Sequence, residues 1–242
     1  MGKAQIIVNQ HSTLDFGVYL QYPIVLAHPQ VDLNPVQIPG HSGDLLANNH
    51  RFQNITQTFN LVIKKPSKYI TWSSLSLALQ EWLVSDTYQT IILDTLHGWY
   101  WEGYLSSPPV ITPTNDCDAT GSISFNCKPY MKRIDSIDFE PVPSMFFNTT
   151  DSIAEPIIHI VGNGNFTINV NGTNYELIDV SEEVFIDSEQ SWIYQHDEIQ
   201  NRASWAHFPN NDFPILKQGQ NTISITGNYS KFEYKPNWRR LA

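Results

Sequence analysis

One segment of this chain, residues 70–84, has the apolar spacing of an amphipathic helix, and the rest of the sequence does not. The large apolar residues of the segment recur every three or four positions: Trp72, Leu75, Leu79, Trp82 and Leu83. Thr71 or Ser67 is placed to cap its first turn. Elsewhere, short apolar runs alternate with turns, many of them marked by the 15 prolines. The pattern therefore predicts a mainly β protein with one α-helix.

In the first half, six runs are typical of strands: Gln5–Asn9, Leu14–Leu20, Arg51–Lys64, Gln89–Asp94, Trp99–Leu105 and Ser122–Cys127. Gly17, inside the second run, indicates a bulge. Leu96-His97-Gly98 is expected to turn the chain between the fourth and fifth runs, which then form a pair.

The second half contains strand signals only. Its runs are Ile157–Val161, Phe166–Val170, Tyr175–Ile178, Val184–Ile186, Trp192–Tyr194 and Thr222–Thr226, followed by Phe232 and Tyr234. Asn171-Gly172 is the strongest hairpin signal in the chain, because a type I′ turn requires positive φ at both central residues. This half is expected to form a β-sandwich or jelly roll.

The stretch between the halves has little periodicity and contains Pro141 and Pro143. We therefore expect an N-terminal domain over residues 1–135, a linker over 136–152 and a C-terminal β-sandwich over 153–242.

The net charge of −10 excludes nucleic-acid binding by affinity, because such proteins need a basic surface to displace counterions from phosphates. An acidic surface is still compatible with a passage through which DNA moves without adhering. No apolar stretch approaches the ~20 residues of a membrane span, so no membrane partner is expected. Cys117 and Cys127 form no metal-type pair and are expected to be reduced thiols; the alternative is a pair facing across a hairpin turn at Gly121.

No catalytic pattern is present. The candidate carboxylates for glycoside hydrolysis are Glu155, Glu182, Glu183 and Asp187, and nothing in the sequence places two of them about one bond. The histidines form no HExxH motif, and no nucleophile elbow or phosphate-binding glycine loop occurs. We expect a non-enzymatic protein without metal or cofactor.

Three groups of residues are candidates for structural or interface roles: Pro39, Gly40 and Gly43; Trp99, Trp101 and Tyr104; and Trp238, Arg239 and Arg240. The first group predicts a tight turn with positive φ. The second puts aromatic rings on both faces of one strand, as expected where a core covers one face and a neighbouring subunit the other. The third is expected to pack back onto the protein, because an exposed Trp is costly and Arg pairs well with carboxylates.

The alternative functional hypothesis is carbohydrate recognition by the C-terminal domain. Exposed aromatic rings stack on sugar rings, and Trp192, Tyr194 and Trp205 are the candidates. The same residues are equally typical of a core or a subunit contact.

An ordered series of motifs gives the chain a family resemblance. The front half carries Leu14–Val18, then Val36–Gly43, which is like a "vPGrdG" turn with His41 and Ser42 at its centre. Ile123–Tyr130 is similar to an "F-x-C-x-P-Y" segment that closes a first domain, and the back half continues with Phe208-Pro209, Leu216–Ile223 and Pro236–Leu241. The chain resembles the distal tail (Dit) proteins of siphophages.

The resemblance implies a structural virion protein at the tip of a phage tail, assembled in the cytoplasm of the bacterial host. Its N-terminal domain would form a homohexameric ring, and its C-terminal domain would be a galectin-like β-sandwich that points outward. The ring would join the tail tube and tail completion proteins to a Tal-type hub, act as a platform for receptor-binding proteins in host adhesion, and let DNA pass through its lumen.

Overall fold

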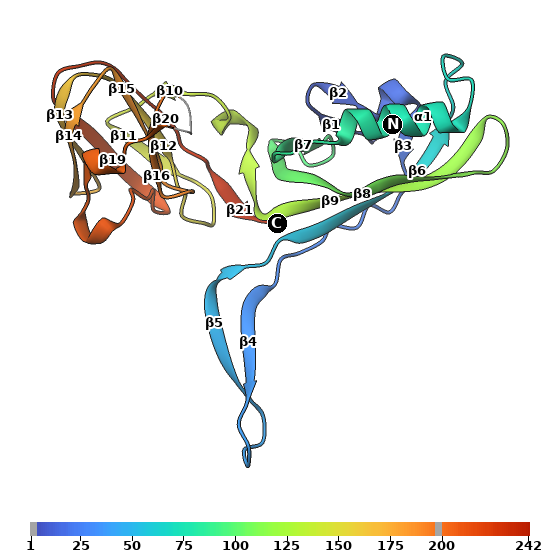
Figure 1. The fold of residues 1–242 in the computed structure, drawn as a ribbon, viewed down its shortest axis with the longest axis horizontal. Helices are drawn as coiled ribbons and strands as arrows, with labels where there is room; N and C mark the ends of the chain where they lie inside the picture. The colour runs from blue at the N-terminus through green and yellow to red at the C-terminus, as the bar shows by residue number, and fades with distance from the viewer. Residues whose placement is uncertain (1–3, 197–199) are drawn as a thin grey trace. The chain divides into compact units, whose positions relative to one another are not determined.

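The computed structural model describes residues 4–196 and 200–242, and it divides into two compact units (Figure 1). Unit 1 comprises the chain up to Met131 together with Leu241–Ala242, and unit 2 comprises Lys132–Arg240. The described residues are mainly strands and contain one α-helix, as the sequence predicted.

Unit 1 is built on an eight-stranded sheet in the order β2-β1-β7-β8-β9-β6-β3, with β21 paired to β9. The strands of this sheet are β1 (Ile6–Val8), β2 (His11–Ser12), β3 (Val18–Leu20), β6 (Ile55–Lys64), β7 (Gln89–Leu93), β8 (Trp99–Pro113), β9 (Asp118–Arg133) and β21 (Arg239–Leu241), of which only Leu241 belongs to unit 1. Buried and exposed residues alternate strictly along β6, so one face of this strand lies in the core and the other in solvent. The predicted pairing of β7 with β8 is confirmed, with Gln89 opposite Gly103.

The helix α1 (Trp72–Leu83) covers the core face of this sheet. Thr71 caps it, since its hydroxyl accepts a hydrogen bond from the Ser74 amide at 3.1 Å. Leu75, Leu79 and Leu83 are fully buried. Trp82 lies at the margin of the core, where its Nε1 donates to the Val8 carbonyl at 3.0 Å.

At two glycines the local structure differs from the one that the sequence predicted. Gly17 is not in a bulge; it ends the short 3-10 helix η1 (Thr13–Phe16) with φ 69°. Gly121 is not in a turn but inside β9, so Cys117 and Cys127 do not face each other across it. Both thiols are free, and burial raises the pKa of Cys127 to about 12.

Unit 2 consists of two antiparallel sheets that share one apolar core. The first sheet contains β10 (Glu140–Pro141), β20 (Tyr229–Lys235), β12 (Ile157–Gly162), β15 (Glu183–Asp187), β16 (Trp192–Gln195) and β17 (Gln200–Asn201). The second contains β11 (Met145–Asn148), β19 (Gly219–Thr226), β13 (Gly164–Val170), β14 (Thr173–Val180) and β18 (Ala206–His207). Asn171 and Gly172 join β13 to β14 with φ of 52° and 88°, so the predicted hairpin turn is confirmed.

The structure places the division between the units at Met131 and Lys132, not after residue 135. The stretch 136–152, expected to be a linker, contains β10 and β11, which pair with β20 and β19 of unit 2. Both strands are short edge strands, which explains why their sequences show no alternation; at an edge a strand tolerates Pro141.

The close approach of β8 to β9 predicts a large effect of a single methyl group. An alanine Cβ at position 121 would lie 2.1 Å from the Val110 carbonyl oxygen, which is backbone and cannot move aside. We expect Gly121→Ala to lower the free energy of unfolding by more than about 3 kcal/mol. The matched control is Gly98→Ala, where φ is 82° but no atom lies within 4 Å; left-handed strain alone should cost about 1–2 kcal/mol. Urea unfolding would compare them, and equal losses would contradict the packing argument.

Candidate interaction surfaces

Strands β4 (Val31–Gln37) and β5 (Asp44–Phe52) form a two-stranded sheet that pairs with no other described strand. We call this β-hairpin, residues 31–52, the arm. Figure 1 shows it running out from the sheet of unit 1. The sequence analysis missed both strands as such and assigned only the end of β5, as the start of the run Arg51–Lys64.

The arm leaves apolar side chains in solvent. Its exposed large hydrophobic residues are Val31, Leu33, Val36, Ile38, Leu45 and Leu46, of which Leu45 and Leu46 are 58% and 59% exposed. An isolated two-stranded hairpin is marginally stable in water, because it has no second layer against which to bury a face. Exposed apolar side chains in this number are typical of a protein–protein contact, and the register places Val36 and Leu45 on one face of the arm and Leu33 and Leu46 on the other.

Polar contacts fix the base of the arm. The Arg51 Nε donates to the Asp32 carboxylate at 2.6 Å, and the Gln53 amide donates to its other oxygen at 3.2 Å. The hydrogen bonds from Arg51 and Gln53 lower the pKa of Asp32. The two strands are therefore tied together where they leave unit 1.

The predicted tight turn lies at the tip of the arm. Gly40 and Gly43 have φ of 85° and 90°, and the His41 amide donates to the Ile38 carbonyl at 3.1 Å. No atom lies within 4 Å of the Cβ position of either glycine, so both serve the backbone conformation and not a close approach. Pro39 and its neighbours are fully accessible to a partner.

The aromatic residues of β8 are divided between core and surface. Trp101 is 1% exposed and contacts Phe59 at a ring-centroid distance of 6.4 Å, so it belongs to the core of its own unit. Its ring is therefore covered by the chain's own core. Trp99 is partly buried against the same core. Tyr104 is 39% exposed and contacts Tyr88 edge to face, which leaves it available to a neighbour.

The C-terminal residues are packed within the chain. Trp238 is buried in the core of unit 2, and Arg239 Nε donates to the Ile153 carbonyl at 2.9 Å while its guanidinium pairs with Glu155. Arg240 is half-buried. Trp238 and Arg239 therefore stabilise the chain's own fold and offer little surface to another subunit.

The three residues considered for sugar stacking form no common platform. Tyr194 is buried and stacks on Phe185 at 4.9 Å, and Trp205 packs beside the core under the Arg202 guanidinium. Only Trp192 presents substantial surface, at 37%.

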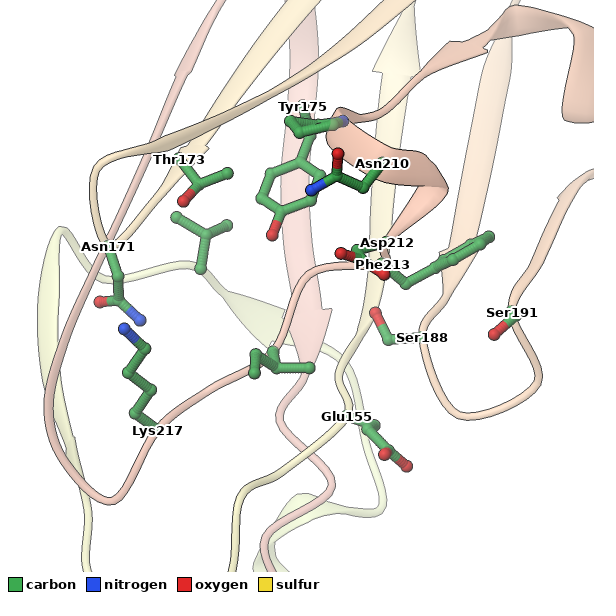
Figure 2. A pocket seen from close by; sticks show the side chains of 13 residues that line it. Glu155, Asn171, Thr173, Tyr175, Ser188, Ser191, Asn210, Asp212, Phe213 and Lys217 are labelled. Carbon is green, nitrogen blue, oxygen red and sulfur yellow. The ribbon is translucent and has the colours of Figure 1, made fainter. Parts of the chain in front are cut away.

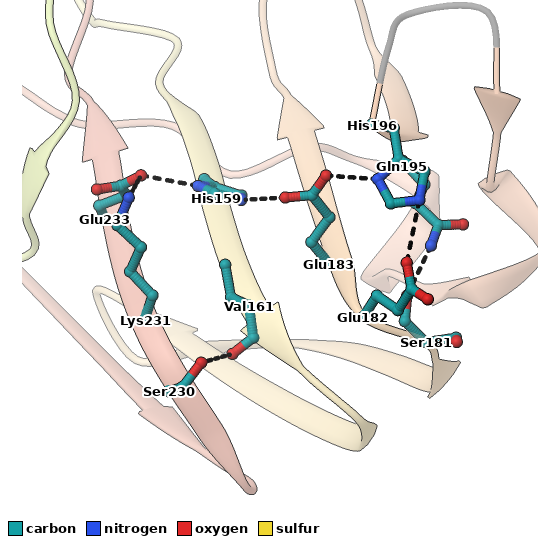
Figure 3. Close-up of polar contacts among 10 residues, drawn as sticks. All are labelled: His159, Val161, Ser181, Glu182, Glu183, Gln195, His196, Ser230, Lys231 and Glu233. Carbon is teal, nitrogen blue, oxygen red and sulfur yellow. Dashed lines mark hydrogen bonds and ion pairs between the residues drawn. The ribbon is translucent and has the colours of Figure 1, made fainter.

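A row of charged groups crosses the outer face of the β20-β12-β15-β16 sheet (Figure 3). His159 lies between two carboxylates, with Nδ1 2.8 Å from Glu233 and Nε2 2.9 Å from Glu183. The row continues through His196, whose Nδ1 lies 2.8 Å from Glu183 and whose Nε2 lies 3.1 Å from Glu182. Glu182 and Glu183 are thus held by histidines and do not form an acid–base pair about an open site.

The environment of this row shifts two pKa values. Burial acts to raise the pKa of Glu183, but hydrogen bonds from His159 and His196 outweigh it, so the pKa lies below its usual value of 4.5. The pKa of Glu233 is lowered in the same way, with burial opposed by the Lys231 ammonium at 2.7 Å and by His159.

Within the described ranges, no group of three or more His, Cys, Asp or Glu residues is arranged to hold a metal ion. A search of the same residues finds no helix with the length and apolar character needed to cross a bilayer.

The similarity of this chain to known proteins lies in its fold. The chain matches no protein-family model and no curated protein sequence. Among solved structures it is similar to the crystal structure of the SPP1 Dit (gp 19.1) protein, a paradigm of the hub adsorption apparatus in phages that infect Gram-positive bacteria. The TM-score is 0.66 at 12% identity, over 96% of this chain and 97% of that one. The fold is therefore Dit-like over essentially the whole chain.

The lowered pKa of Glu183 predicts an acid-dependent loss of stability. Above the unfolded value near 4.5 the depressed folded pKa contributes stability, and this contribution disappears as the pH falls through the folded pKa. We expect Glu183→Gln to destabilise unit 2 by about 1–2 kcal/mol at pH 7 and to show a smaller loss of stability below pH 4.5 than the wild type.

Thermal unfolding followed between neutral and acidic pH would measure this difference. The control is Glu176→Gln, at an exposed position on the outer side of β14. Parallel pH profiles for Glu183→Gln and the wild type would contradict the role given to the histidine contacts.

Proposed function

We propose that this chain is a structural subunit of a bacteriophage tail tip, of the distal tail type, which assembles into a closed homomeric ring through unit 1. The arm carries the proposal: it extends from a Dit-like unit 1 with its apolar side chains exposed to solvent. Burying this surface against a second copy of the chain would remove the cost of leaving it in water.

A contact between the arm of one copy and a different surface of the next is heterologous. Such contacts either close into a ring or propagate into a filament. Tyr104 and the outward residues of β8 supply further exposed surface on the same unit. The hexameric number follows from the family resemblance, and the location in unit 1 follows from the exposed apolar residues.

In this proposal the ring joins the tail tube and tail completion proteins to a Tal-type hub at the virion tail tip, after assembly in the host cytoplasm. Unit 2, proposed to be galectin-like, points outward and offers the platform on which receptor-binding proteins dock for host adhesion. The net charge of −10 suits a lumen through which DNA passes without binding. The proposed role requires no catalysis and no cofactor.

Mutation of the arm tests the ring. We expect the wild-type protein to form a species near six times 27.7 kDa, alone or with purified tail tube or hub protein. The double variant Leu45→Glu, Leu46→Glu should remain monomeric, because two carboxylates would have to be desolvated in the contact. Mass photometry and light scattering measure both states.

The control is Leu77→Glu, a leucine on α1 of the same unit that is even more exposed than Leu45 and Leu46. Assembly lost in this variant but kept in the arm variant would place the contact at the helix. A strictly monomeric wild-type protein that also fails to join tube or hub protein would defeat the ring proposal.

A further inference from the structure

Unit 2 contains a pocket of about 490 Å³, a size within the roughly 300–1,000 Å³ range of small-molecule sites. Four parts of the chain form it: the segment before β12 with Glu155, the β13–β14 hairpin, the turn between β15 and β16, and the loop 209–217 before β19 (Figure 2). None of the residues considered for sugar stacking lines it. These parts are far apart in the sequence, so no local motif marks the site.

Several polar side chains that line the pocket have no partner among the described residues. The side chains of Tyr175, Asn210, Asp212 and Lys217 make no hydrogen bond or ion pair with any described residue. Figure 2 shows the phenol of Tyr175, the carboxylate of Asp212 and the hydroxyl of Ser188 directed toward one another, with Lys217 on the opposite side. Unpaired donors and acceptors thus face one hollow from several directions.

Ser188 gives the strongest indication of a ligand. The residue is 7% exposed, and its Oγ is buried with no hydrogen-bond partner among the described residues. A buried hydroxyl without a partner is costly, and such groups in folded proteins usually bind water, an ion or a ligand. Ser188 is one of the residues that line the pocket.

The charges and aromatic surface limit the chemistry of that ligand. Burial raises the pKa of Tyr175, and the nearby Asp212 carboxylate raises it further, so the phenol remains a donor at neutral pH. Asp212 accepts hydrogen bonds, while Ser188 and the Asn210 amide both donate and accept. Phe213, packed edge to face on Phe208, adds an apolar ring to the lining.

Several ligand classes fit this lining poorly. An aliphatic ligand would bury the unpaired polar groups without satisfying them. A phosphate would meet the Asp212 carboxylate beside Lys217, while Glu155, which also lines the pocket, is already paired with Arg239. The described residues hold no metal-type cluster. A polyhydroxylated ring, which both donates and accepts around its edge and has an apolar face, matches the lining.

We propose that this pocket of unit 2 binds one saccharide unit of a glycan, with Asp212, Tyr175 and Ser188 on its hydroxyl groups. The proposal is independent of ring formation, which involves unit 1.

Saturation-transfer NMR on the full chain tests the proposal, with glucose, galactose, N-acetylglucosamine and N-acetylgalactosamine as probes. We expect at least one of them to receive saturation and, on titration, to shift the backbone amides of Ser188, Asn210 and Asp212. Asp212→Asn and Ser188→Ala should each weaken binding about tenfold, the loss expected when a hydrogen bond to the ligand is removed.

Two control variants lie on unit 2 outside the pocket: Asp179→Asn and Tyr229→Phe, both at exposed positions. They should bind like the wild type, and Tyr175→Phe should bind more weakly than Tyr229→Phe. Ser188→Ala should melt no lower than the wild type, because it removes an unsatisfied buried hydroxyl; a lower melting temperature would indicate a structural role for that group.

Absence of saturation transfer with all four sugars would overturn the proposal, as would equal binding by pocket and control variants. Inorganic phosphate shifting the same amides more strongly than any sugar would overturn it in favour of an anion site. Because oligomeric state is measured separately, each of these results leaves the ring proposal intact.

Discussion

The architecture of unit 1 depends on a difference in length: two central strands, β8 and β9, are far longer than α1, the one helix among the described residues that covers the sheet. The helix α1 has 12 residues and spans about 18 Å at 1.5 Å per residue, whereas β9 has 16 residues and spans about 53 Å. Residues near the start of β8, including Trp101, are buried, while most of the strand from Tyr104 onward is exposed. The arm continues this imbalance, because β4 and β5 have no second layer at all. Surface that the chain cannot cover itself is surface on which another subunit can pack.

In unit 2, by contrast, the apolar faces of the sheets are covered by other parts of the same unit. Its two sheets face a common core, so each buries the apolar face of the other. The outside carries the polar row around His159, exposed apolar side chains such as Met145 and Phe147 on β11, and the loops at the ends of the strands. The pocket lies among these loops, since much of its lining comes from turns and loops that the sandwich holds in place. A rigid scaffold of this kind can present unpaired polar groups without collapsing on them.

The elements that pack against a core were predictable from the sequence, and the exposed ones were not. The helix, the β7–β8 pair and the Asn171-Gly172 turn were predictable, because each combines a strong local signal with a face that packs on a core. The arm was not, because a hairpin with two exposed faces is under no pressure to alternate apolar and polar residues. The pocket was out of reach for a different reason: Tyr175, Ser188 and Asp212 come together only after the strands between them have paired.

Each unit retains groups that its own fold does not satisfy. Unit 1 leaves apolar side chains such as Leu45 and Leu46 in water, and this cost is relieved only by a large surface that excludes solvent. Unit 2 leaves polar atoms such as the Ser188 hydroxyl without partners, and this cost is relieved by a small ligand with matching donors and acceptors. A second protein chain satisfies the first requirement and a sugar hydroxyl the second. In the two proposals, assembly and recognition rest on separate units, so a change in the glycan recognised would require no change in the ring.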